Sequence, residues 1–173
     1  AGTPIVRVPD DIPAAVLAPV SCGTATAFAA LAAAGQVRPL EGAEVLISGA
    51  GMIGLTATAM AVDRGASVTV VDPDPARRDL ARRFGAAQTL APGASPGEFD
   101  AAIEASGSPA AVATSLVSAG IGGVVLLVGS VFSTEAVPLD PERVVRSLLT
   151  IRGVHNYTPL QLAAATDYIV DRW

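Results

Sequence analysis

The sequence predicts an α/β domain built on a doubly wound parallel sheet of six strands, in the spatial order 3-2-1-4-5-6. Three observations lead to this fold class. An apolar run at 45–48 leads into the glycine turn Gly-Ala-Gly-Met-Ile-Gly at 49–54. A helical pattern follows, and a second apolar run at 67–71 then ends at Asp72. A dinucleotide requires this succession of strand, glycine turn, helix, strand and acid, with the acid about 20 residues after the turn.

The bulk composition narrows the classes of protein. The chain has 173 residues, which fit one domain with or without a short attached segment. Its net charge is −5 and its 11 basic residues are all arginine, so no lysine can serve as a base, a Schiff-base former or a phosphate ligand. An acidic domain with scattered arginines is a poor candidate for binding nucleic acid or an anionic membrane. The many small apolar residues suit helices packed tightly on a parallel sheet.

The single cysteine excludes an internal disulfide and makes a reducing cytoplasm the default location. The chain contains no run of about 18 uninterrupted apolar residues, and its N-terminus lacks the pattern of a signal peptide. We therefore expect no membrane segment. Because the sequence does not begin with Met, and because its last helical pattern still runs close to Trp173, both ends are interpreted as cuts in a longer protein.

The part of the chain before the glycine turn contains two helical patterns. Residues 4–20 indicate a short extended segment and then a weak helix bounded by prolines, without the features of a nucleotide-binding element. A helix of small residues is predicted over 21–34 and ends at Gly35. A loop then leads into the first strand, at 44–48.

Each glycine of the turn has a separate role in the prediction. Gly49 allows the tight turn, Gly51 lets bare backbone approach a pyrophosphate, and Gly54 lets the following helix pack against the strand. That helix is predicted over 52–64 and ends at Gly65. Its N-terminus offers free N–H groups to the phosphates.

Strands and helices alternate through the rest of the chain, which predicts the doubly wound sheet. Prolines mark helix starts, and Asp74 is expected to cap the helix that opens at Pro75. The further strands are predicted at 67–72, 88–90, 99–105, 123–129 and 150–154. The further helices are predicted at 75–84, 109–119 and 140–149, and from Pro159 onward.

The ligand of such a sheet lies at the carboxyl ends of the strands, where the strand order reverses between strands one and four. The predicted lining is therefore the glycine turn, Ser106 and Gly107 after strand four, and Val128 and Gly129 at the end of strand five.

Asp72 decides which cofactor the sequence favours. It could be a turn or capping residue, but its position 18 residues after Gly54 favours recognition of the ribose hydroxyls. A carboxylate there repels the 2′-phosphate of NADP, which favours NAD. Arg77 and Arg78 argue in the other direction, because arginines just past the acid can bind a 2′-phosphate. The acid has the greater weight, since its charge lies nearer the ribose.

The residues give no complete catalytic constellation. Taken alone, Cys22 is more often a small buried apolar residue than a ligand. His155 is a single loop histidine, which most often only forms hydrogen bonds. One cysteine and one histidine do not make a zinc site, because such sites use at least three protein ligands.

Four stretches together resemble the medium-chain, zinc-dependent alcohol dehydrogenase family. They are Pro-Val-Ser-Cys-Gly-Thr-Ala-Thr-Ala-Phe, Gly-Ala-Gly-Met-Ile-Gly, Val-Val-Asp-Pro-Asp-Pro-Ala-Arg and Glu-Ala-Ser-Gly. The likeness runs from about Ile5 to Trp173. It implies that residues 21–173 are the NAD(P)-binding Rossmann domain of such an enzyme. Residues 1–20 would be the linker from a missing N-terminal catalytic domain, which supplies most of the zinc ligands.

The resemblance assigns further roles at the catalytic end. Cys22 resembles the last ligand of the catalytic zinc, and Thr26 matches a threonine that faces the nicotinamide. Val128 and Gly129 end the strand whose backbone meets the nicotinamide carboxamide. His155 and Asn156 fall near another contact to that group, but their surroundings depart from the commoner family patterns and leave their role open.

At the adenosine end, the roles that the resemblance implies agree with the roles inferred above from the residue pattern. Asp72 matches the ribose acid, and Arg77 matches a basic residue that helps to hold the same ribose. Ser106 and Gly107 lie where the family contacts the adenosine side. Gly49, Gly51 and Gly54 match the pyrophosphate turn of the family. Met52 and Ile53 match the residues that donate backbone N–H groups to the pyrophosphate.

The implied reaction of the full enzyme is reversible oxidation of a small-molecule alcohol to a carbonyl compound, with zinc polarising the alcohol oxygen and hydride passing to NAD. The chain alone is expected to bind the cofactor without turnover and to hold no zinc. A second copy could pair with strand six at the sheet edge.

The alternative functions are a zinc-independent quinone or enoyl reductase, an S-adenosylmethionine-dependent methyltransferase and a non-catalytic NAD-sensing module. The substrate and the catalytic residues are not identified by the sequence.

Overall fold

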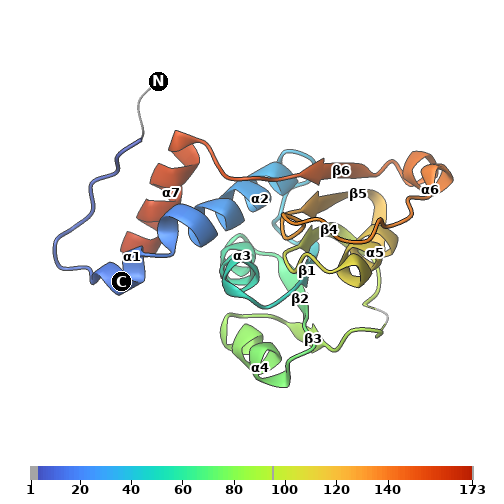
Figure 1. The fold of residues 1–173 in the computed structure, drawn as a ribbon, viewed down its shortest axis with the longest axis horizontal. Helices are drawn as coiled ribbons and strands as arrows, with labels where there is room; N and C mark the ends of the chain where they lie inside the picture. The colour runs from blue at the N-terminus through green and yellow to red at the C-terminus, as the bar shows by residue number, and fades with distance from the viewer. Residues whose placement is uncertain (1–3, 95, 173) are drawn as a thin grey trace.

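The predicted sheet is present in the computed structural model, which describes residues 4–94 and 96–172 (Figure 1). Six strands lie in the order β3-β2-β1-β4-β5-β6. Every neighbouring pair is parallel, and the order reverses between β1 and β4. The fold class and the strand order expected from the sequence are thus confirmed.

The elements follow one another as strand and helix along most of the chain. The strands are β1 Glu44–Ser48, β2 Ser67–Val71, β3 Gln88–Leu90, β4 Phe99–Glu104, β5 Ala119–Leu127 and β6 Thr150–Gly153. The helices are α1 Ala14–Leu17, the π-helical turn η1 Val20–Thr24, α2 Ala25–Gly35, α3 Met52–Asp63, α4 Pro75–Arg83, α5 Pro109–Ser118, α6 Pro141–Arg146 and α7 Pro159–Val170.

Two apolar layers hold helices on opposite faces of the sheet. Val45 and Ile47 of β1 belong to the larger layer, together with residues of α2, α3, α4 and α7. Leu46 faces the other way and belongs to a smaller layer with Leu116 of α5. Alternate residues of a strand point to opposite faces, so one strand supplies both layers.

Helix α2 is a core helix of this domain. The segment Ala14–Gly35 is long and apolar enough to cross a membrane by length and composition, but half of its apolar window is buried inside the protein. Ala27, Ala30 and Leu31 of α2 are fully covered and belong to the larger apolar layer. In Figure 1, α2 lies beside α3 and α7. Its apolar character is explained by this packing.

The helix predicted over 21–34 differs from the observed one at its start. Helix α2 begins at Ala25, and η1 precedes it. The carbonyl of Pro19 accepts from the N–H groups of both Gly23 (2.8 Å) and Thr24 (3.1 Å). The turn is thereby widened by one residue. Such π-helical turns are rare and are frequent at functional sites.

Strand five also differs from the prediction, which placed it at 123–129. The observed β5 begins at Ala119, which pairs with Phe99, and ends at Leu127. The glycines in Ala-Gly-Ile-Gly-Gly have low strand propensity, so the pattern concealed this early part of the strand. Val128 and Gly129 therefore follow the strand instead of ending it. Helix α6, predicted to reach 149, ends at Arg146.

Polar side chains fasten α7 to the end of α3. The hydroxyl of Tyr168 donates to Asp63 Oδ2 at 2.6 Å. Arg172 forms an ion pair with the same carboxylate, and its guanidinium lies 3.9 Å from the centroid of the Tyr168 ring. These three residues form the α3–α7 clasp.

The α3–α7 clasp is expected to weaken in alkali. Burial raises the pKa of Tyr168 well above its ordinary value of about 10, and the hydrogen bond to Asp63 adds to the increase. The stabilisation is complete below the unfolded pKa and is lost as the pH rises through the folded one. Between pH 9 and pH 11, urea unfolding followed by circular dichroism should therefore show a steeper loss of stability in the wild type than in Tyr168→Phe. Equal losses would contradict this role of the hydroxyl.

Candidate functional site

The glycine turn joins β1 to α3 by close backbone packing. Gly49 has φ +102°, a conformation that favours glycine, and a Cβ there would lie 3.0 Å from the Cβ of Ser106. A Cβ on Gly54 would lie only 1.8 Å from the carbonyl oxygen of Gly49. The protein's own packing therefore requires glycine at both positions. It brings the start of α3 directly onto the end of β1.

Gly51 differs from these two glycines. A Cβ on Gly51 would meet no protein atom within 4 Å. Gly51 is the N-cap of α3, and the first N–H groups of the helix, at Met52 and Ile53, have no acceptor within the helix. These donors and the positive end of the helix dipole suit an anionic group at this turn.

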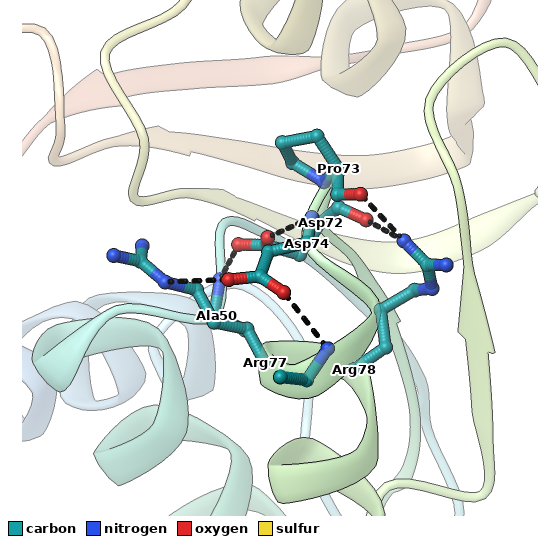
Figure 2. A network of polar contacts seen from close by, with 7 residues as sticks. Ala50, Asp72, Pro73, Asp74, Arg77 and Arg78 are labelled. Carbon is teal, nitrogen blue, oxygen red and sulfur yellow. Dashed lines mark hydrogen bonds and ion pairs between the residues drawn. The ribbon is translucent and has the colours of Figure 1, made fainter.

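Asp72 connects the glycine turn to the loop after β2. Asp72 as a whole residue is 4% exposed. Oδ2 accepts from the N–H of Ala50 at 2.7 Å, and Oδ1 accepts from the N–H of Asp74 at 2.9 Å (Figure 2). An ionised carboxylate has about four acceptor positions. The two bonds to the backbone therefore leave acceptor capacity for two hydroxyl donors.

The two arginines after Asp72 are held in different ways (Figure 2). Arg78 Nη1 donates to the carbonyl of Asp72 at 2.7 Å and to that of Pro73 at 2.9 Å. The side chain of Arg77 is 57% exposed, and its Nε lies 3.9 Å from Asp74 Oδ2. Asp74 also caps α4, as expected, by accepting from Ala76 N at 2.8 Å. Arg78 is thus engaged by the backbone, and Arg77 is accessible.

Two adjoining cavities lie along the carboxyl ends of β1, β2 and β4. They have volumes of about 350 and 410 Å³ and share Gly49, Asp72, Pro73 and Ser106. The first is mostly apolar, and the second adds charged groups. The first cavity is further lined by Ser48, Val71, Pro92, Gly93, Ala94, Ser108, Ala110, Ala111 and Thr114. The second is further lined by Gly51, Asp74, Arg77 and Ala105.

The loops after β4 and β5 touch through their backbones. A Cβ on Gly107 would lie 2.6 Å from the carbonyl oxygen of Gly129. A Cβ on Gly129 would lie 2.5 Å from Ser106 N. Val128, beside them, is 4% exposed. The structure therefore brings the two predicted loop pairs, Ser106–Gly107 and Val128–Gly129, into direct contact.

Cys22 lies in the π-helical turn η1 and is exposed. Its neighbour Gly23 lies against the first residue of α3, because a Cβ on Gly23 would be 2.5 Å from Met52 Cε. The thiol segment and the glycine turn are therefore adjacent. Thr26, one turn later, is 8% exposed, so most of its side chain is covered by the protein.

His155 and Asn156 lie in the exposed loop after β6. This loop and α2 line a cavity of about 330 Å³. The hydroxyl of Tyr157 donates to the carbonyl of Ser21, which connects the loop to the segment that carries Cys22. Within residues 4–94 and 96–172, no three His, Cys, Asp or Glu side chains gather as a metal site. These residues do not by themselves fit a zinc ion, and Cys22 can offer one ligand.

One buried acid at this edge is not among the site residues predicted from the sequence. Glu104, at the end of β4, is 0% exposed, and its carboxylate accepts hydrogen bonds from the loop after the strand. The signal was present, because Glu104 directly follows the apolar run Ala-Ala-Ile and stands just before Ala-Ser-Gly. The pattern alone did not show that the loop after β5 is also within its reach.

The sheet order and the glycine turn are those of a Rossmann-type α/β domain, the fold class that commonly binds dinucleotides. A family model described as zinc-binding dehydrogenase matches residues 53–171. The L-threonine 3-dehydrogenase of Streptomyces coelicolor is 36% identical over 132 residues, which are 68% of this chain and 37% of that protein.

Solved structures agree with this class. The alcohol dehydrogenase of Thermotoga maritima is similar at a TM-score of 0.87 and 25% identity, over 96% of this chain and 49% of that one. A zinc-binding dehydrogenase of Sinorhizobium meliloti, solved with NADP, gives a TM-score of 0.86 at 24% identity, over 95% of this chain and 51% of that one. The second likeness supports the fold alone.

The chain belongs to the zinc-binding dehydrogenase family, because the family model matches more than half of its length. This confirms the resemblance to medium-chain, zinc-dependent alcohol dehydrogenases. The chain spans about half of the solved relatives described above and 37% of the threonine dehydrogenase.

Proposed function

We propose that this chain is the NAD-binding half of an oxidoreductase that transfers hydride between a small-molecule alcohol and NAD. The observation that carries the proposal is the buried carboxylate of Asp72, which is fixed beside the glycine turn by the N–H groups of Ala50 and Asp74. Its remaining acceptor positions suit the two hydroxyls of the adenosine ribose.

The choice of NAD over NADP rests on charge. A 2′-phosphate on that ribose would place a second negative group close to Asp72, where burial reduces screening. Arg78 offers little compensation, because its guanidinium is bonded to backbone carbonyls. Arg77 remains accessible and is assigned to the ribose hydroxyls. The NADP-bound relative shares the fold, and the charge of Asp72 is the basis for our choice.

The rest of the adenosine half fits the neighbouring surfaces. The mostly apolar cavity between Val71 and Ala110 suits a planar adenine ring. The first N–H groups of α3, at Met52 and Ile53, suit the pyrophosphate. The open space at Gly51 permits the phosphate to approach the backbone.

The nicotinamide half is assigned to Thr26, Val128 and Gly129. When bound, the nicotinamide ring supplies a hydride acceptor. The role of the chain is to hold one face of that ring in a fixed position. Cys22, adjacent to the glycine turn, is assigned as one ligand of a zinc ion whose other ligands belong to a preceding domain of the full enzyme. The chain alone is expected to bind the cofactor without turnover.

The sheet edge and the exposed thiol support proposals about the oligomeric state and the location of the full protein. The outer edge of β6, at Thr150–Gly153, is the end of the sheet order and can pair with a second copy. We therefore propose a homo-oligomer. A reducing cytoplasm suits the exposed thiol of Cys22.

Calorimetric titration of the chain with NADH, NADPH and S-adenosylmethionine tests the cofactor. We expect NADH to bind at least about tenfold more tightly than NADPH, in line with an uncompensated charge pair worth more than 1.4 kcal/mol. Tighter NADPH binding would overturn the choice of NAD. Binding of S-adenosylmethionine in place of both would overturn the dehydrogenase proposal in favour of a methyltransferase.

A further inference from the structure

A second buried carboxylate lies on the other side of β1 from Asp72. Glu104 ends β4, and its side chain is 0% exposed. Oε1 accepts from Ser106 N (2.7 Å), Ser106 Oγ (2.7 Å) and Gly107 N (2.8 Å). Oε2 lies 3.3 Å from the hydroxyl of Ser130, which donates to it. The carboxylate thus binds the loop after β4 with one oxygen and the loop after β5 with the other.

The backbone of Glu104 connects the same two loops. Its carbonyl oxygen accepts from the N–H groups of Val128 and Gly129, both at 2.9 Å. Gly107 and Gly129 then allow the loops to pack backbone on backbone, as described above. Main chain, side chain and the two glycines therefore form one junction between the loops.

A carboxylate at the end of a buried strand lowers the stability of the fold unless it is hydrogen-bonded. Burial of a charge carries a large desolvation penalty unless hydrogen bonds replace water. Ser106, Gly107 and Ser130 donate to this carboxylate through N–H and hydroxyl groups, which carry no charge. An ionised acceptor makes stronger and more directional bonds than a neutral one. This chemistry suits the fixing of two loops in one relative position.

The two loops face different halves of the proposed cofactor site. Ser106 lines both cavities beside Asp72, on the adenosine side. Val128 and Gly129 are assigned to the nicotinamide side. We propose that Glu104 is a positioning residue that holds the adenosine-side and nicotinamide-side loops together, so that the whole dinucleotide binds at a preformed surface. This inference rests on the proposed function.

The test compares four variants with the wild-type chain. Glu104→Leu removes the acceptors, and Glu104→Gln keeps one oxygen for Ser106 and Gly107 while its amide group can donate to Ser130. Ser130→Ala removes the bond to the nicotinamide-side loop alone. Val68→Ala is the control for general loss of stability, because Val68 is fully buried near the opposite end of the sheet.

Binding of NADH and AMP is measured by calorimetry, together with the fluorescence of bound NADH and the unfolding midpoint. Glu104→Leu should weaken NADH binding at least about tenfold, and AMP binding less. Glu104→Gln should stay within about threefold of the wild type. Ser130→Ala should weaken NADH about two- to fivefold, leave AMP unchanged and alter the NADH emission. Val68→Ala should lower the midpoint without changing either affinity.

The possible failures are distinguishable. A wild-type chain that binds neither NADH nor AMP overturns the proposed function and this inference with it. A wild-type chain that binds both, with a folded Glu104→Leu variant of unchanged NADH affinity, overturns this inference alone. This inference alone is also overturned if Val68→Ala loses as much NADH affinity as Glu104→Leu. If Glu104→Leu does not fold, Ser130→Ala decides: unchanged NADH affinity and emission overturn the inference.

Discussion

Gly54→Ala is expected to lower the free energy of unfolding by about 3 kcal/mol or more and to abolish measurable NADH binding. The added Cβ would lie 1.8 Å from the carbonyl oxygen of Gly49, which is backbone and has no rotamer with which to move away. Helix α3 must shift off β1, and the N–H groups at its start shift with it. Urea unfolding followed by circular dichroism and calorimetry with NADH measure the two effects.

Gly35→Ala is the matched control for this prediction. Gly35 is the last residue of α2, and a Cβ there would meet no protein atom within 4 Å. Alanine also has the higher helix propensity, so stability should change by less than about 1 kcal/mol and binding should not change. The packing argument is wrong if Gly54→Ala behaves like Gly35→Ala.

Asp72→Asn is expected to weaken NADH binding about 10- to 100-fold, equivalent to about 1.4–2.8 kcal/mol. The amide keeps the shape of the acid but offers one oxygen in place of two. Because the N–H groups of Ala50 and Asp74 both need an acceptor, one of them would face an NH₂ group. NADPH should lose less affinity than NADH, because the charge that repels its 2′-phosphate is removed.

Asp74→Asn is the comparison for the loss of a nearby charge. Asp74 caps α4 from an exposed position, and asparagine is about as good a cap as aspartate. Its NADH affinity should stay within about twofold of the wild type. Titration of both variants with NADH and NADPH gives the four affinities. An unchanged NADH to NADPH ratio in Asp72→Asn would remove the basis for choosing NAD.

The order of the sheet was predictable because local signals agreed with one another. Prolines at 75, 109, 141 and 159 start the four helices that follow β2, and the predicted strand 88–90 coincides with β3. The glycine turn identified β1 as the first strand, which lies between β2 and β4 where the strand order reverses. Each of these signals acts within a few residues, so the sequence shows it directly.

What the sequence could not show depends on contacts between distant segments. The π-helical turn before Ala25 is a local exception: the carbonyl of Pro19 accepts from the N–H groups of Cys22, Gly23 and Thr24, and no residue pattern predicts this. The early start of β5 is set by pairing with Phe99, against the weak strand propensity of its glycines. The hydrogen bond from Ser130 to Glu104 joins the end of β4 to the loop after β5, and the two residues are 26 positions apart in the chain. The residues of the cofactor site were named from sequence, and their cofactor roles remain predictions.

The α3–α7 clasp has a consequence for how the chain folds. Asp63 and Tyr168 are 105 residues apart, and the Tyr157–Ser21 bond spans 136 residues. Ribosomes deliver these partners at widely separated times, so α2 and α3 are complete long before α7 can cover them. Such distant contacts slow folding, because the entropy of closing a long loop is lost before the stabilising contacts can form. During synthesis, the part of α2 that packs against α7 therefore stays uncovered until the last helix is made.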